Sequence, residues 1–224
     1  LVQEIAPADW YFEHLEGLID VETIRHNPLK IVADPLYGAG LGYLEAFLSP
    51  LGCQVETIHG YRDPFFGGGL PDPAPPYLEE LQHRVLSAGA QLGLALDGDG
   101  DRLGVVDAAG RYWSANRILP LLLKHLVEKR KWRGKVARTV ATSHMLDRLC
   151  ASYGLELIET PVGFKYIGQV LREENAILGG EESGGLSIAG HIPEKDGLLA
   201  ALLMVELTCT FDRQPGEIYE AISK

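Results

Sequence analysis

Cysteine is scarce in this sequence, which has only Cys53, Cys150 and Cys209 among its 224 residues. An odd number of widely spaced cysteines excludes a disulfide framework and a cysteine-rich metal site. We therefore expect free thiols in a reducing compartment, which points to the cytoplasm. No apolar run approaches the length that crosses a bilayer, and no signal-peptide pattern is visible at the start, so no membrane partner is expected.

Positive charge is also in short supply, because 20 Lys and Arg residues stand against 31 Asp and Glu residues, a formal net charge of −11. This balance excludes nucleic acid and anionic membranes as favoured partners, since both are polyanions. The composition, 46% hydrophobic and 23% charged, is that of a globular protein. The length allows one large domain or two of ordinary size, and a first residue other than Met predicts a piece of a longer protein.

The most informative segment is residues 94–107, where Asp97, Asp99 and Asp101 alternate with glycines between two apolar runs. Alternate residues of an extended loop project to one side, so the three carboxylates can converge. Their repulsion would force protons onto them unless a cation were present. Oxygen ligands favour Mg²⁺, with Mn²⁺ or Ca²⁺ after it. Arg102 adds a fixed cation that suits an oxyanion, so the loop predicts a metal site that meets a phosphate.

Three other interpretations of this segment compete with a phosphate-facing metal site. An EF-hand loop needs Gly at its sixth position and Glu at its twelfth, where this sequence has Arg102 and Ala108. A haloacid-dehalogenase-like phosphatase also begins with a strand and D-x-D, but normally continues with a long excursion instead of an immediate return strand. A plain solvated acidic turn is the third alternative, because turns favour Asp-Gly.

Apolar runs and helical patterns alternate along the chain. Both halves follow the order strand, helix, strand, helix, strand, acidic glycine-rich loop, strand. This rhythm predicts an α/β fold with two topologically similar domains, at residues 1–106 and 107–224, each with a mixed, mostly parallel sheet flanked by helices. Strands are expected at 30–34, 54–58, 94–96, 103–107, 111–113, 135–140, 155–159, 176–178 and 186–189, and helices at 9–24, 41–51, 77–87, 116–129, 145–153, 166–173 and 195–211.

A second glycine-rich loop, residues 179–185, contains two glutamates and a serine. The spacing of Glu181 and Ser183 directs both side chains to one side, with Glu182 opposite and structural. Carboxylate and hydroxyl groups on a backbone that a ligand can approach closely are suited to vicinal sugar hydroxyls. Taken alone, the pattern fits a surface turn equally well.

Lys165 stands at the predicted start of a helix, after the sequence TPVGF. A lysine is unfavourable there for the helix dipole, so a role beyond helix stability is indicated. An anion at this point would meet both the ammonium and the free backbone amides. A solvated lysine is the alternative.

Three motifs together resemble the α-D-phosphohexomutase superfamily, the phosphoglucomutases and phosphomannomutases: DGDGDR at 97–102, VGFK at 162–165 and GEESG at 180–184. The loop at 62–73 and the segment HIPEKDG at 191–197 are similar too, so the resemblance covers nearly the whole chain. It implies that Mg²⁺ would be held by Asp97, Asp99 and Asp101, that the catalytic residues would include Arg102 and Lys165, and that the substrate would be bound by Glu181, Ser183 and Lys165.

The family pattern has four domains, and two of its landmarks are missing here. The first domain of the family carries a phosphoserine in a Thr-x-Ser-His-Asn-Pro-like loop. The nearest string, at 142–145, lacks Asn-Pro, so Ser143 is interpreted as a helix cap. The phosphate-gripping loop of the last domain is absent as well. The resemblance therefore implies domains two and three only, with the missing N- and C-terminal domains and a hexose phosphate as partners.

The function implied is interconversion of hexose 1-phosphate and 6-phosphate by Mg²⁺-dependent phosphoryl transfer through a bisphosphate intermediate. The sequence at 181–185, EESGG instead of a loop that ends in His, favours glucose phosphates, with mannose possible. The chain alone is expected to be inactive, because it lacks the phosphoserine. The alternative is a non-catalytic module that binds a sugar phosphate or a divalent ion.

Overall fold

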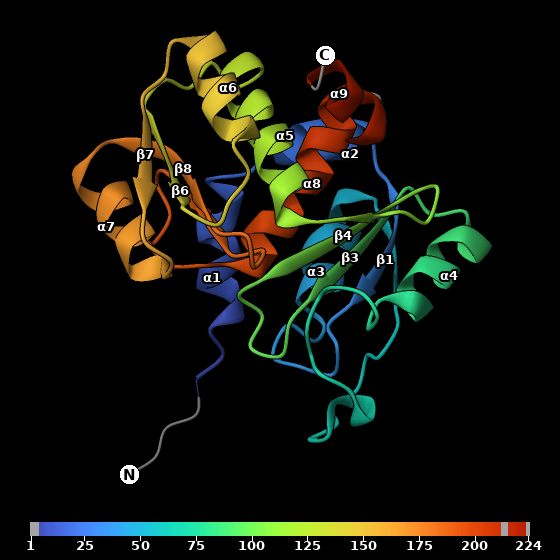
Figure 1. Cartoon of the computed structure of the whole chain (residues 1–224). Coiled ribbons are helices and arrows are strands. Elements are labelled where there is room, and N and C mark those ends of the chain that lie inside the picture. The colour runs from blue at the N-terminus through green and yellow to red at the C-terminus, as the bar shows by residue number, and fades with distance from the viewer. Residues whose placement is uncertain (1–4, 212–214, 223–224) are drawn as a thin grey trace.

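The computed structural model describes residues 5–211 and 215–222; the outermost residues of the two predicted domains, 1–4 and 223–224, lie outside this part. It contains two mixed sheets flanked by helices (Figure 1). The first sheet has the order β2-β1-β3-β4-β5, with β1 parallel to β2 and β3 and the last two pairings antiparallel. Its strands are β1 (Lys30–Asp34), β2 (Gln54–Thr57), β3 (Leu92–Leu96), β4 (Leu103–Asp107) and β5 (Tyr112–Trp113).

The second sheet has the order β7-β6-β8-β9, with β6 parallel to both of its neighbours and β9 antiparallel to β8. In each sheet, a parallel strand is thus followed by a loop, and the chain then returns as an antiparallel neighbour of that strand. This arrangement confirms the predicted fold class. Its strands are β6 (Lys135–Thr139), β7 (Leu157–Thr160), β8 (Ala176–Gly180) and β9 (Leu186–Ile188).

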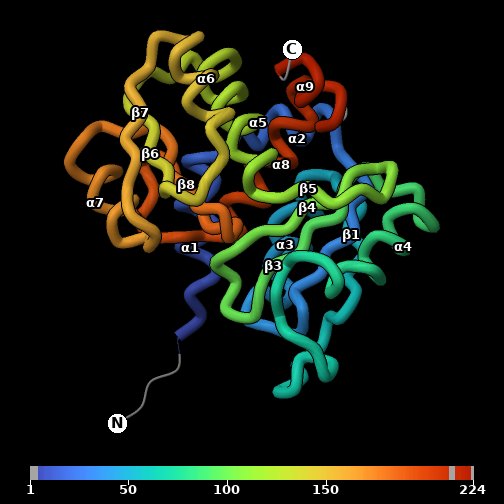
Figure 2. Tube along the Cα trace, viewed as in Figure 1, coloured from blue at the N-terminus to red at the C-terminus, as the bar shows by residue number. Residues whose placement is uncertain are grey.

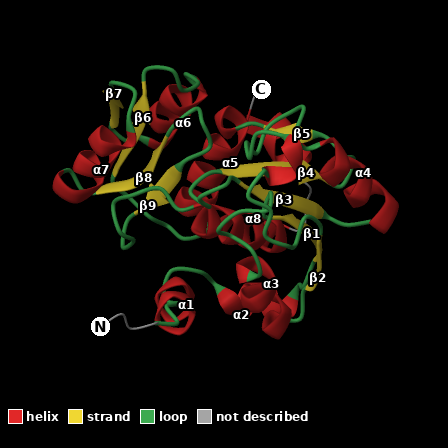
Figure 3. Cartoon of the chain, turned by 90° about the horizontal axis from the view of Figure 1, so that it is seen from below, coloured by secondary structure: helices red, strands yellow, loops and turns green. Residues whose placement is uncertain are grey.

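Helices connect the parallel strands and pack on both sheets (Figure 3). The long loop between β2 and α4 extends at the lower end of the trace (Figure 2). The α-helices are α1 (Ala8–Glu16), α2 (Val21–His26), α3 (Tyr43–Leu48), α4 (Glu79–Ala88), α5 (Ala115–Glu128), α6 (Met145–Tyr153), α7 (Phe164–Glu173), α8 (Gly197–Phe211) and α9 (Pro215–Ile222), and the 3-10 helices are η1 (Ser49–Leu51) and η2 (Phe66–Gly68).

The prediction of one helix over residues 9–24 is wrong, because the segment forms α1 and α2 with a break between them. Gly17 ends α1, and Asp20 begins α2 by accepting the Thr23 N–H at 3.0 Å, the usual N-cap bond. The apolar pattern across the break was also misleading, because Trp10 is 61% exposed while Leu15 is fully buried. Helix α9 was not predicted.

Helix α8 connects the two halves of the molecule. It is apolar on all sides, a pattern typical of a buried helix, and all its residues from Gly197 to Cys209 are buried. It packs against β3, β4 and α2 on one side and against α5 and β9 on the other. Strand β5 likewise pairs with the first sheet, although the boundary after residue 106 assigns it to the second half. The division at that boundary stays a prediction.

The one acidic residue of α8, Glu206, anchors the helix to its surroundings. Its carboxylate accepts hydrogen bonds of 2.7 Å from His125 Nε2 and Arg130 Nε, and one of 2.9 Å from the Asp20 N–H. Burial disfavours the charge of this carboxylate, but the bonds from His125 and Arg130 outweigh burial and lower the pKa of Glu206 to about 2. The ion pair therefore fixes α8 against α5 and against the chain before α2.

Within the part of the chain that the structure describes, no helix has the length and apolar character needed to cross a membrane. The three cysteines are buried and unbridged, as the sequence predicts.

Candidate functional site

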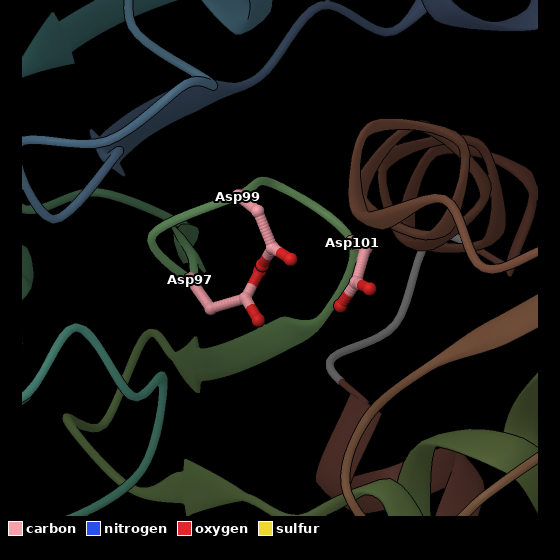
Figure 4. Close-up of side chains that lie close together, drawn as sticks. All are labelled: Asp97, Asp99 and Asp101. Carbon is pink, nitrogen blue, oxygen red and sulfur yellow. The ribbon is translucent and has the colours of Figure 1, made fainter. Parts of the chain in front are cut away.

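The three predicted metal ligands lie together in the turn between β3 and β4, residues 97–102, which we call the aspartate loop. Each of Asp97, Asp99 and Asp101 offers a carboxylate oxygen, and these oxygens lie within 4.8 Å of one another. Figure 4 shows the three side chains converging from opposite sides of the loop. Asp97 is buried, Asp101 is half-buried and Asp99 is exposed, so the cluster opens to solvent on one side.

Two cations of the protein itself balance part of this negative charge. The Arg102 Nε donates to Asp97 Oδ2 at 2.6 Å, and its backbone N–H donates to Asp97 Oδ1 at 2.9 Å. The Arg102 Nη1 reaches Asp72 at 3.1 Å. The Lys195 Nζ lies 2.7 Å from Asp101 Oδ2. Burial alone would lower the pKa of Lys195, but Asp101 outweighs burial and the net shift is upward.

The cluster fits a small hard cation. All of its donors are carboxylate oxygens, the ligand type that Mg²⁺ and Ca²⁺ prefer. Octahedral Mg²⁺ has its ligands at about 2.1 Å, which places neighbouring oxygens about 3 Å apart. The three carboxylate oxygens here lie within 4.8 Å of one another, so they would move closer together around such an ion. Asp99, at the open side of the cluster, makes no hydrogen bond or ion pair with the described residues.

Two neighbouring segments hold the aspartate loop in place. The Ala39 N–H donates to the Gly98 carbonyl at 3.0 Å, and the Gly98 N–H donates to the Pro71 carbonyl at 3.2 Å. Only glycine fits at Gly38, because a Cβ there would lie 2.4 Å from the Gly98 oxygen. The turn after β1 and the long Gly/Pro loop thus contact the aspartate loop from two sides. The Gly/Pro loop also contains Asp72, which accepts a hydrogen bond from Arg102.

The second glycine-rich loop, residues 181–185 between β8 and β9, is called the glycine loop below. The Ser183 hydroxyl lies 3.5 Å from Glu181 Oε2, so these two side chains share one side of the loop. Glu182 turns away and accepts a 2.6 Å hydrogen bond from the Thr139 hydroxyl, which agrees with its structural interpretation. Glu181 is 6% exposed, and burial raises the pKa of its carboxyl group.

The aspartate and glycine loops meet directly, although about 80 residues separate them. The Leu103 N–H donates to the Gly184 carbonyl at 3.3 Å, and Arg102 and Gly185 form an antiparallel bridge. Gly184 has φ +104°, and a Cβ there would lie 2.8 Å from the Leu103 oxygen. The stem of Lys195 occupies the space over Gly185. The carboxylates of the aspartate loop and those of the glycine loop therefore lie on one continuous surface.

Lys165 lies near the glycine loop through its backbone. The Gly163 N–H, just before α7, donates to Glu181 Oε1 at 3.1 Å. The Lys165 side chain is exposed, and its Nζ lies 4.9 Å from the ring centre of Tyr166, a cation–π contact. The structure thus brings the segment of Lys165 to Glu181, while its ammonium rests on the neighbouring ring.

Sequence reasoning missed Lys195, Asp72 and Gly197 as parts of this site. The Gly197 N–H, at the start of α8, donates to the Gly100 carbonyl at 3.0 Å, so α8 begins against the aspartate loop. A usable signal was present, because Lys195 and Asp196 form a charged pair directly before a long apolar segment. Ser143 was predicted to cap the helix, but the N-cap of α6 is His144; Ser143 lies one residue earlier, and its hydroxyl accepts the Met145 N–H at 3.2 Å.

The fold and the site together define a class of protein: two mixed α/β sheets whose central strands end in adjoining acidic loops, one of them with a carboxylate cluster. Comparison with known proteins identifies this class. Residues 9–110 match the family model for phosphoglucomutase/phosphomannomutase alpha/beta/alpha domain II, and residues 114–224 match domain III of the same family. The chain belongs to the phosphoglucomutase/phosphomannomutase family of phosphohexomutases.

Curated relatives carry several names. The chain is 29% identical to a phosphoglucomutase/phosphomannomutase of Thermococcus kodakarensis over 96% of its length, 31% identical to a phosphomannomutase of Escherichia coli over 96%, and 31% identical to a phosphoglucosamine mutase of Nautilia profundicola over 94%. These alignments cover 47%, 48% and 47% of the relatives, so the chain spans about half their length.

Solved structures agree with this assignment. A phosphomannomutase-type protein of Thermus thermophilus superposes on the whole chain with a TM-score of 0.93 at 31% identity, and 52% of that structure is covered. A family protein of Burkholderia thailandensis gives a TM-score of 0.87 at 27% identity, over 98% of this chain and 47% of that one. An Aspergillus fumigatus N-acetylphosphoglucosamine mutase, solved with GlcNAc-6P and magnesium, shares the fold at 14% identity with a TM-score of 0.69.

Proposed function

We propose that this chain is the metal- and sugar-binding central part of a phosphohexomutase that interconverts hexose 1-phosphate and 6-phosphate, with glucose favoured and mannose possible. The observation that carries the proposal is the backbone bridge between Arg102 and Gly185, which joins a carboxylate cluster to a glycine-rich loop on one surface. A phosphorylated sugar needs both kinds of site at once, because its phosphate is anionic and its ring carries neutral hydroxyls.

The aspartate loop would serve the phosphate. Asp97, Asp99 and Asp101 would hold Mg²⁺, which when bound supplies positive charge to the oxygens of the transferring phosphoryl group. Arg102 would place its guanidinium beside those oxygens. Its orientation is already determined by Asp97 and Asp72, so little reorganisation is needed when charge develops.

The glycine loop would serve the sugar. Glu181 and Ser183 share one side of the loop and can accept from and donate to neighbouring hydroxyls of a ring. A buried carboxylate suits the neutral hydroxyls of a sugar, because each hydroxyl can donate a hydrogen bond to it. Lys165, on the segment bonded to Glu181, would position the substrate or its phosphate after leaving the Tyr166 ring.

The phosphoryl group itself would come from a phosphoserine on a domain outside this chain, with a hexose bisphosphate that reorients between the two transfers. Neither Ser143, whose hydroxyl is bonded to the start of α6, nor Ser183, in the sugar-facing loop, is suited to that role. The missing N- and C-terminal domains would therefore complete the site. The three buried thiols are compatible with a reducing cytoplasm, where we place the parent enzyme.

A coupled assay of the parent enzyme with glucose 1-phosphate, catalytic glucose bisphosphate and Mg²⁺ tests the proposal. We expect conversion to glucose 6-phosphate by the parent and none by this chain alone. In the parent, Glu181→Gln and Ser183→Ala should each lower kcat/KM by roughly 5- to 150-fold, since a lost hydrogen bond to a ligand is worth about 1–3 kcal/mol.

The matched control is Ser152→Ala, which removes a hydroxyl that donates to the Leu149 carbonyl on α6 and has no other hydrogen-bond partner among the described residues. It should leave kcat/KM unchanged. Unchanged kcat/KM in both glycine-loop variants would show that the glycine loop has only a structural role. Absence of conversion of any hexose phosphate by the parent would contradict the assigned reaction.

A further inference from the structure

Backbone strain is concentrated beside the aspartate loop. Six non-glycine residues among those the structure describes have a positive φ, and four of them are Leu36, Tyr37, His59 and Phe66. Such conformations cost free energy and persist where the surroundings over-determine them, often at functional sites. Leu36 and Tyr37 form the turn after β1, and His59 follows β2, the neighbouring parallel strand.

A buried carboxylate lies at the centre of this strained region. Asp34, the last residue of β1, is fully buried. Its Oδ1 accepts the Leu36 N–H at 2.9 Å and lies 2.9 Å from His59 Nδ1, while its Oδ2 has no hydrogen-bond partner among the described residues. A buried carboxylate with an unsatisfied oxygen is costly unless a neighbouring cation offsets its charge. The imidazole of His59 is the group placed to do so.

His59 is surrounded by groups that favour its charged form. Its Nε2 lies 3.1 Å from Glu80 on α4, so both ring nitrogens face carboxylate oxygens, and only the imidazolium can donate to both. The ring of Tyr37 lies against it at 4.6 Å between centroids, and Tyr61 packs against Tyr37. The hydrogen bond to Asp34 raises the pKa of His59 above its usual value.

This ion pair reaches the aspartate loop through the turn that it stabilises. Asp34 holds the left-handed turn by accepting the Leu36 N–H, and the same turn donates the Ala39 N–H to the Gly98 carbonyl. Gly98 lies between two of the proposed metal ligands. At Gly38 the packing is too tight for a side chain, so a shift of the turn would be transmitted to Gly98 instead of being absorbed.

We propose that the Asp34–His59 ion pair is a positioning element for the aspartate loop, so that protonation of His59 sets the affinity of this loop for a divalent cation. The inference rests on the proposed metal site. Both residues lie outside the ligand set, and the hydrogen bonds that link them to the aspartate loop run through the turn at residues 35–39. The pair therefore acts through the geometry of Gly98 and not by touching the cation or the substrate.

The direction of the effect follows from the sign of the charge. Below the pKa of His59 the imidazolium offsets the charge of Asp34, the turn is held and the cation site is formed. As the pH rises through that pKa, Asp34 becomes a buried, unbalanced anion, and the turn and Gly98 lose their support.

The test is Mn²⁺ affinity, measured by water-proton relaxation between pH 6 and pH 9, in the wild-type chain, His59→Asn and His83→Asn. Asn tolerates a left-handed backbone and keeps a donor near Asp34, but does not titrate. His83 is an exposed residue of α4 and is the matched control. We expect affinity to fall about fivefold with rising pH in the wild type and in His83→Asn, and to stay flat in His59→Asn.

A second measurement keeps the inference separate from the proposed function. In the metal-free chain, the amide resonance of Gly98 should follow the titration of His59 in the wild type and lose that dependence in His59→Asn. If no variant binds Mn²⁺ yet Gly98 follows His59, the metal assignment fails and the positioning link stands. If Mn²⁺ binds with the same pH dependence in His59→Asn as in the wild type, or if Gly98 ignores His59, the positioning role is overturned.

Discussion

The aspartate loop and the glycine loop are both acidic and are built on the same plan, but their carboxylates have different partners. Each follows a central parallel strand, β3 or β8, and returns along an antiparallel one. In the aspartate loop the carboxylates face cations, Arg102 and Lys195, and one of them is exposed and unpaired among the described residues. In the glycine loop the carboxylates accept hydrogen bonds from neutral donors, the Gly163 N–H and the Thr139 hydroxyl.

Under the proposed function, one topology would support two kinds of recognition. Carboxylates grouped together at an open edge demand a cation, and a divalent ion satisfies that demand better than two side chains do. A carboxylate that is already hydrogen-bonded to neutral groups, and whose pKa is raised by burial as in Glu181, does not. Because a backbone bridge joins the loops, a ligand with both an anionic and a neutral part can contact both.

The difference between the two loops is tested most directly by removing one carboxylate from each loop. Asp99→Asn should abolish the divalent-cation site of the purified chain, because it removes the exposed ligand, which no described residue neutralises by direct contact. Glu181→Gln should leave the site intact. Calorimetry or Mn²⁺ relaxation can count the sites in both variants. Equal binding by wild type and Asp99→Asn would refute the ligand assignment, and loss of binding in Glu181→Gln would show that the two loops are not distinct.

The contact between the loops can be broken separately. Gly184→Ala should destabilise the chain by about 3 kcal/mol, since the new Cβ meets the Leu103 carbonyl oxygen at 2.8 Å and the backbone has φ +104°. Gly154→Ala is the control, because Gly154 has φ +66° with open space around its Cβ position, and it should cost only about 1 kcal/mol. Urea denaturation of the two variants measures the difference. Equal losses would mean that the bridge contributes nothing to stability.

The smallest expected effect concerns the cation that lies between the loops. Lys195→Met should raise Mn²⁺ affinity about threefold, because an ammonium 2.7 Å from Asp101 repels the incoming ion and occupies one of its ligand oxygens. Lys165→Met removes an equal charge from the glycine-loop side, where Nζ rests on the Tyr166 ring, and should change affinity little. A fall in affinity in Lys195→Met would show instead that Lys195 holds Asp101 in its binding orientation.

Much of the plan of the fold could be predicted locally. Short apolar runs between glycines and helical patterns located the strands to within a few residues, and the alternation of Asp and Gly indicated the carboxylate cluster. Local patterns failed at residues 9–24, where the cap at Asp20 overrides a continuous apolar rhythm. They also gave no sign of the Asp34–His59 pair, since neither residue belongs to a recognisable motif and they meet only because β1 and β2 are neighbours.

The sequence by itself determined the fold class, the alternation of strands with most of the helices, the residue types gathered in both loops and the family, because periodicity, turn residues and motifs are properties of short segments. Only the tertiary structure decided that the two loops share one surface and that Lys195 lies between them. The physical reason is the burial of α8, which is apolar on every side and can be covered only by packing against both halves at once. That packing brings the start of α8 against the aspartate loop and places Lys195 over the glycine loop.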